Sequence, residues 1–115
     1  MKCSGRAAHT LPFLVMLTAV GVSAARAAER PSAHTHTVTI EALQFQPAEL
    51  IVHRRDRIVW TNKDPFPHTV TAASKLFDSR SLGAEGSWTY VASRRGEFPY
   101  GCTLHPTMKG KIVVQ

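Results

Sequence analysis

A short segment near the C-terminus brings three different metal-binding side chains close together. Two residues separate Cys102 from His105, two more separate His105 from Met108, and Pro106 lies within the segment. A thiolate, an imidazole and a thioether at this spacing cannot meet at one ion if the chain continues as a strand, but they can converge from one tight loop. Thiolate and thioether favour Cu(I), and imidazole suits both oxidation states of copper. The segment therefore predicts part of a copper site.

A second imidazole is available upstream. His68 directly follows a loop that contains Pro65 and Pro67, and it begins a segment of β character. Two imidazoles, a thiolate and a weak axial thioether are the ligands typical of blue-copper sites. The predicted ligands are therefore His68, Cys102, His105 and Met108.

Other interpretations of these residues account for less of the pattern. Haem attachment through Cys-x-x-Cys-His requires a further cysteine that the segment lacks. Zinc accepts Cys and His, but Met is a poor zinc ligand and structural zinc sites usually use two or more thiolates. A papain-like nucleophile needs a much larger scaffold. Taken singly, Cys102 is as well explained as a buried thiol and Met108 as core filler. Their joint spacing favours copper.

Two further histidines could bind a metal weakly at the surface. His34 and His36 flank Thr35 and would share one face of a strand. Histidines near a loose chain terminus are usually solvated, and His53, near a turn, is expected to be exposed as well. We therefore do not include them in the predicted copper site.

The N-terminal segment predicts export. Lys2 and Arg6 precede an apolar run over residues 11–22, and small residues follow up to Ala27. This order is typical of a secretory signal peptide, and the run is too short to span a bilayer. We expect a signal peptide over 1–27, a flexible leader over 28–36 and one domain over 37–115.

Removal of that segment changes the cysteine count and the charge. Of two cysteines only Cys102 remains, and an unpaired thiol in an oxidising compartment is a liability unless something occupies it. The net charge falls from +6 to +3, which is too weak and too scattered for nucleic-acid binding. A copper enzyme with a second copper centre would need many more histidines than the five that remain. The sequence therefore predicts no enzyme.

The elements that must position these residues are strands. Apolar side chains recur with period two, and turn signals come every eight to twelve residues, which predicts a Greek-key β-sandwich of about seven to eight strands. A change of phase after Ala42 predicts a bulge or bend, and Phe77 and Leu82 should pin a long loop over 73–84 to the core. The expected strands are 37–42, 49–53, 58–60, 68–72, 87–92, 97–102 and 111–115.

The sequence resembles the cupredoxins of the plastocyanin/azurin superfamily and is most similar to the amicyanin branch. That branch also has two residues on each side of the loop histidine, whereas plastocyanin and pseudoazurin have more residues before the Met. Further matching segments are Trp60-x-Asn62-x-Asp64, Pro67-His68-Thr69-Val70, Phe77-Asp78-Ser79, Gly96-x-Phe98-x-Tyr100-x-Cys102 and Met108-Lys109-Gly110-x-Ile112-Val113-Val114.

The resemblance implies one type 1 copper ion, bound by His68, Cys102 and His105 with Met108 as the axial ligand. It implies a soluble, periplasmic one-electron carrier whose His105 reaches the surface through an apolar rim. The expected partners are redox proteins, an electron donor and an acceptor such as a dehydrogenase and a c-type cytochrome. We expect a monomer with no stable membrane insertion. The alternative is an exported copper-binding protein for delivery or resistance.

Three details of the sequence carry separate expectations. Many relatives have Asn after the first histidine ligand, where it joins the two ligand loops, and here the hydroxyl and N–H of Thr69 should replace it. Asp64 should partly offset the charge of Lys63 near the copper site. Strand directions place five arginines at the opposite end of the domain, namely Arg54, Arg55, Arg57, Arg94 and Arg95.

Overall fold

Residues alternate between buried and exposed positions along short segments, which is the pattern of strands with one face on a core. In the first strand Val38 and Ile40 are fully buried, whereas Thr37 before them and Glu41 after them are exposed. The computed structural model describes residues 3–5, 10–16, 19, 21 and 32–115. The predicted cleavage site after Ala27 lies outside these residues. No helix within the described ranges is long and apolar enough to cross a membrane.

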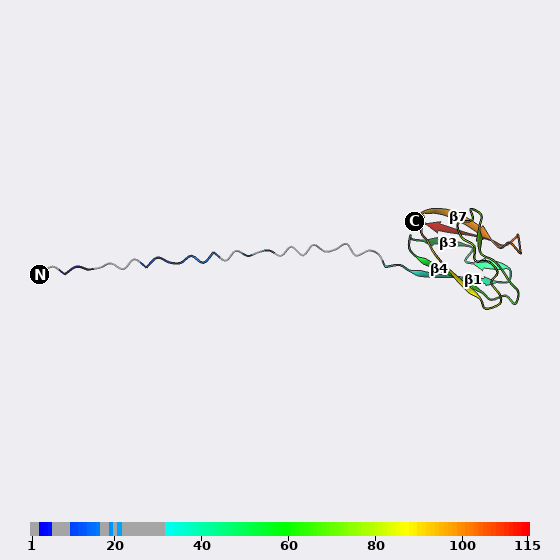
Figure 1. The fold of residues 1–115 in the computed structure, drawn as a ribbon, viewed down its shortest axis with the longest axis horizontal. Helices are drawn as coiled ribbons and strands as arrows, with labels where there is room; N and C mark the ends of the chain where they lie inside the picture. The colour runs from blue at the N-terminus through cyan, green and yellow to red at the C-terminus, as the bar shows by residue number, and fades with distance from the viewer. Residues whose placement is uncertain (1–2, 6–9, 17–18, 20, 22–31) are drawn as a thin grey trace. The chain divides into compact units, whose positions relative to one another are not determined.

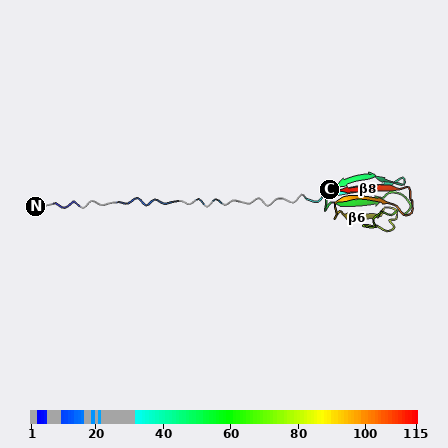
Figure 2. The same cartoon turned by 90° about the horizontal axis from the view of Figure 1, so that it is seen from above.

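Eight strands form two four-stranded sheets, which confirms the predicted all-β sandwich (Figure 1, Figure 2). The order in one sheet is β2-β1-β4-β6 and in the other β3-β8-β7-β5. Each sheet contains one parallel pair, β1 with β4 and β3 with β8. The strands are β1 (Thr35–Glu41), β2 (Gln44–Gln46), β3 (Glu49–Val52), β4 (Arg57–Asn62), β5 (Thr71–Ala72), β6 (Ser87–Val91), β7 (Gly96–Gly101) and β8 (Lys109–Val114).

Several strand boundaries differ from the sequence-based expectation, and three of these differences change the description of the fold. The bend near Ala42 is a two-residue hairpin turn, and the residues after it form the separate strand β2. β1 begins at Thr35, two residues before the expected domain boundary. The strand expected over 68–72 is reduced to β5, because His68 forms only an isolated bridge with Leu82. The prolines before His68 remove the backbone donors that a longer ladder would need.

The core between the sheets is built around aromatic rings. Trp60 of β4 is fully buried, and its ring lies 5.6 Å from that of Tyr100 in β7 at an interplanar angle of 84°. Phe77 is buried against both residues, and Leu82 is buried as well. These two side chains therefore anchor the long loop after β5, as predicted.

Strand directions define two ends of the sandwich. β4 runs from Arg57 to Asn62 and β7 from Gly96 to Gly101, and both end near the predicted copper ligands. At the opposite end, the N–H of Arg57 donates to the carbonyl of His34 and that of Arg54 to the carbonyl of Gln115. The start of β1 and the C-terminus therefore share that end (Figure 1, Figure 2). We call the two ends the metal end and the arginine end.

Candidate metal centre

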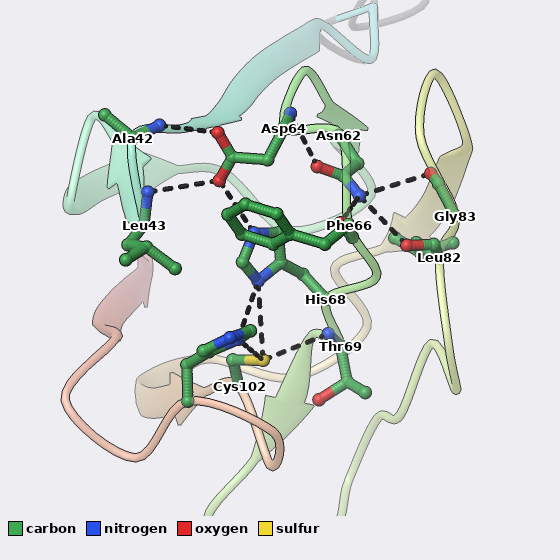
Figure 3. Close-up of polar contacts among 11 residues, drawn as sticks. Ala42, Leu43, Asn62, Asp64, Phe66, His68, Thr69, Leu82, Gly83 and Cys102 are labelled. Carbon is green, nitrogen blue, oxygen red and sulfur yellow. Dashed lines mark hydrogen bonds and ion pairs between the residues drawn. The ribbon is translucent and has the colours of Figure 1, made fainter.

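Three of the four predicted ligands converge at the metal end. The Nδ1 atoms of His68 and His105 are 3.1 Å apart, and the Sγ of Cys102 lies 3.8 Å from the first and 3.7 Å from the second. Cys102 directly follows β7, and His105 lies in the loop before β8. Figure 3 shows the His68 ring above the Cys102 sulfur. In the described part of the chain, no other three His, Cys, Asp or Glu side chains are grouped in this way.

The spacing of these atoms fits a single metal ion. Nitrogen and sulfur ligands lie about 2.0 to 2.3 Å from an ion such as Zn²⁺, and donors around one ion are then about 3 to 4 Å apart. All three donors fall in this range, and all lie within 4.8 Å of one another. One thiolate and two imidazoles form the donor set typical of copper. The residues present therefore fit the metal that the sequence predicts.

The orientation of the His68 ring is fixed by Asp64. The ring is fully buried, and its Nε2 lies 2.7 Å from the Oδ2 of Asp64 (Figure 3). An ionised carboxylate can only accept hydrogen bonds, so Nε2 carries the proton and donates. The neutral ring then has its lone pair on Nδ1, which faces Cys102 and His105. This carboxylate–histidine arrangement is the usual outer support of a metal ligand.

Asp64 is itself held by the hairpin turn after β1. The N–H groups of Ala42 and Leu43 donate to its two carboxylate oxygens at 2.8 and 3.1 Å. Both turn residues have positive φ angles, 53° and 61°, in the left-handed region that most residues avoid. Burial alone would raise the pKa of the Asp64 carboxyl, but hydrogen bonds from Leu43, His68 and Ala42 hold this pKa below its ordinary value.

Asn62 organises the loop between β4 and His68. Its side-chain Oδ1 accepts the N–H of Asp64 at 2.9 Å. Its Nδ2 donates to backbone carbonyls at 2.9 to 3.2 Å, those of Phe66, Leu82 and Gly83 (Figure 3). One buried amide therefore connects the His68 loop to the long loop after β5, and so restricts the backbone that carries the ligand.

Thr69 joins the two ligand-bearing loops, as expected. Its N–H donates to the sulfur of Cys102 at 3.3 Å, and its hydroxyl accepts the N–H of Thr103 at 2.9 Å. The two threonine hydroxyls are 3.2 Å apart. The connection that Asn makes in many relatives is therefore present with a threonine. The N–H on the sulfur also favours the negatively charged thiolate.

The loop of the C-terminal ligands is closed by its own backbone. The N–H of Met108 donates to the carbonyl of His105 at 2.9 Å, and the N–H of Cys102 donates to the carbonyl of Met108 at 3.4 Å. The Met108 side chain is buried, with 2% of its surface exposed. His105 is half-buried, and Phe66 and Leu104 are exposed nearby at 39% and 54%. The site is therefore enclosed except where His105 approaches the surface through apolar side chains.

The prediction that Asp64 offsets the charge of Lys63 was incomplete. Asp64 does not offset Lys63 at the surface, because it is buried and its oxygens are occupied, while Lys63 instead pairs with Glu85 at 2.8 Å. The sequence reasoning missed the role of Asp64. The signal that could have found it is a carboxylate four residues before a predicted ligand and two residues after the Asn that ends the preceding strand.

The geometry agrees with what the chain resembles. Residues 11–114 match the family of cupredoxin-like domains. The chain belongs to the cupredoxin family. Among curated cupredoxins, amicyanin-alpha of Methylorubrum extorquens is 32% identical over 119 residues, which cover 93% of this chain and 99% of that protein. The amicyanin of Paracoccus denitrificans is 29% identical over 83 residues, which cover 68% of this chain and 63% of that protein.

Solved structures give the same result for the cupredoxin fold. The Cu(I) form of an amicyanin variant superposes with a TM-score of 0.67 at 27% identity, over 76% of this chain and 88% of that chain. The resemblance to amicyanin that the loop spacing indicated is thus confirmed.

Proposed function

We propose that this cupredoxin binds one copper ion at the metal end and carries single electrons between redox protein partners. The observation that supports the proposal most strongly is the convergence of the Cys102 sulfur with the Nδ1 atoms of His68 and His105. These three atoms, together with the Met108 side chain, would hold the ion. When bound, copper supplies a centre that accepts and releases one electron.

The contribution of the chain is to hold the ligands in one arrangement and to exclude water. Asp64 fixes the His68 ring, Thr69 joins the two ligand loops, and Met108 closes the C-terminal loop. A site held by packing and hydrogen bonds changes little between oxidation states, so little energy is spent on rearrangement during electron transfer. The apolar surface around His105 would be the place where partners dock.

An exported copper-delivery or resistance protein is the second candidate. Carriers of that kind tend to have open sites rich in Met and His, and they usually lack a Cys ligand in this loop. The test is the visible spectrum of the Cu(II)-loaded protein. We expect an intense band from thiolate-to-copper charge transfer, reversible one-electron reduction, and loss of the band in Cys102→Ala. A pale Cu(II) spectrum would favour a carrier, and a band that persists in Cys102→Ala would contradict the ligand assignment.

We also propose that residues 1–27 are a signal peptide and that the remaining domain works in the periplasm. The support is the order of basic, apolar and small residues in the sequence. Sequencing the N-terminus of the exported protein should give Ala28 as the first residue. A first residue of Met1 on exported protein would contradict the proposal.

A further inference from the structure

The arginine end carries a dense group of exposed cations. The N–H of Arg55 donates to the carbonyl of Ala92 at 2.6 Å, and Arg57 pairs with Val91 in the β4–β6 ladder. The two arginines after Ala92 lead into β7, whose first residue pairs with Val114. The turn before β4, the turn before β7 and the C-terminus are therefore neighbours. The resulting arginine cluster consists of Arg54, Arg55, Arg57, Arg94 and Arg95, all exposed.

The positive charge of the arginine cluster is not neutralised locally. The ion pairs in the described part of the chain involve Lys63, Lys111, His36 and His68, and none of the five arginines. Asp56 lies between them in sequence, but it is buried, and its oxygens accept the N–H groups of His34 and His53 and contact His36. The cluster therefore presents an open positive surface to solvent.

The chain enters the domain at the same end. Ser32 lines a small cavity of about 230 Å³ together with His34, His53, Arg54 and Asp56. Residues 32–34 therefore lie beside the arginine cluster. In the sequence, nine residues separate Ser32 from the apolar run over 11–22.

We propose that the arginine cluster is a docking surface for anionic phospholipid headgroups. Guanidinium groups bind phosphate with two parallel hydrogen bonds, and each basic residue near an anionic membrane surface contributes on the order of a fivefold gain in affinity. The association is peripheral and requires no insertion of the chain into the bilayer.

The orientation that follows leaves the metal end free. The six residues of β4, at about 3.3 Å each, place the metal end roughly 20 Å from the arginine cluster. A domain resting on its arginines would therefore direct His105 and its apolar surroundings away from the membrane, toward partners in the adjoining compartment. The proposal does not rest on copper binding, because the arginine cluster is complete without the metal.

The test compares two sets of three substitutions that remove the same net charge. One set is Arg54→Gln, Arg94→Gln and Arg95→Gln, and the control set, at exposed cations outside the cluster, is Lys75→Gln, Arg80→Gln and Lys109→Gln. The exported protein and both variants are sedimented with vesicles of phosphatidylcholine, with and without phosphatidylglycerol, at low and at physiological salt. All three proteins share the same N-terminus, so any contribution of that segment to vesicle binding is the same in each. The measured quantity is the ratio of binding to vesicles with and without phosphatidylglycerol.

We expect the parent protein to prefer phosphatidylglycerol vesicles and to lose that preference as salt rises. The preference for phosphatidylglycerol should fall on the order of 100-fold in the cluster variant and far less in the control variant. Equal losses in both variants, or an unchanged cluster variant, would overturn the proposal. A parent protein that shows no preference for phosphatidylglycerol would also overturn the proposal. The arginine cluster would then fit a soluble acidic protein instead. Urea unfolding shows whether the cluster variant folds. If it does not fold, the parent protein alone decides the test, and vesicle binding that does not change with salt overturns the proposal.

Discussion

Two buried aspartates at opposite ends of the sandwich have nearly the same surroundings. At the arginine end, Asp56 accepts the N–H groups of His34 and His53, each at 2.9 Å, and lies 2.9 Å from the Nε2 of His36. At the metal end, Asp64 likewise accepts two backbone N–H groups and lies 2.7 Å from a histidine Nε2. Each carboxylate thus satisfies a turn of the backbone and fixes one imidazole ring.

The difference lies on the far side of each ring. The other nitrogen of His68 is 3.1 Å from the Nδ1 of His105 and 3.8 Å from the Cys102 sulfur, and the His68 ring is fully buried. The His36 side chain is 27% exposed, and it belongs to no such group of metal-binding atoms in the described residues. An aspartate–histidine pair is therefore a general way to hold a ring, and it becomes part of a metal site only where further ligands face that ring.

The largest difference between the two ends should appear in copper affinity. Asp64→Asn replaces the carboxylate that orients His68 with a neutral amide that has only one acceptor oxygen, and loss of such a support typically lowers metal affinity by about 10- to 100-fold. Asp56→Asn is the matched control and should leave copper affinity unchanged. Competition with a copper chelator measures both variants. Similar losses of affinity in the two variants would mean that Asp64 acts only through overall stability.

A smaller effect should appear when the pH is lowered. Burial alone would raise the pKa of Asp56, but hydrogen bonds from the His34 N–H, the His36 ring and the His53 N–H hold this pKa well below its ordinary value. A carboxyl whose pKa is lowered by folding stabilises the protein above its unfolded pKa, near 3.9, and this contribution is lost as the pH falls below that value.

The parent protein should therefore lose about 1 kcal/mol more unfolding free energy between pH 5 and pH 3 than Asp56→Asn does. Urea unfolding of the metal-free proteins at both pH values measures this difference. Equal losses in the two proteins would show that the Asp56 carboxylate contributes no stability of its own.

The connection between the ligand loops should contribute less. Thr69→Val keeps the side-chain shape but leaves the N–H of Thr103 without its acceptor, at a cost of about 0.5 to 1 kcal/mol in unfolding free energy. Thr69→Ser should restore most of that stability, because it keeps the oxygen. A serine variant as unstable as the valine variant would point to packing of the methyl group instead.

The smallest effect should come from the surface pair beside Asp64. The side chains of Lys63 and Glu85 are 46% and 70% exposed. Exposed ion pairs contribute little, so Lys63→Ala should leave both copper affinity and the urea midpoint unchanged. A clear loss of copper affinity would mean that the surface charge acts on the metal end.

The sequence was most informative where spacing and chemistry agree. The loop from Cys102 to Met108 indicated a copper site because its three side chains have few other uses together, and period-two alternation indicated the sandwich. Asp64 gave only the weaker signal of a carboxylate four residues before a predicted ligand, and Asp56 gave none. Each is a common polar residue whose role depends on backbone N–H groups far away in sequence, such as Ala42 for Asp64 and His34 for Asp56. The hairpin that contains Ala42 lacks the Asn-Gly dipeptide by which such turns are usually predicted from a sequence.

The most direct test is a crystal structure of the copper-loaded protein with anomalous scattering measured at the copper edge. We predict one copper peak at the metal end, bonded to the Nδ1 atoms of His68 and His105 and to the Cys102 sulfur. The Nε2 of His68 should remain on Asp64. A main peak beside His36 and Asp56, or copper bonded to the Nε2 of His68, would contradict the account.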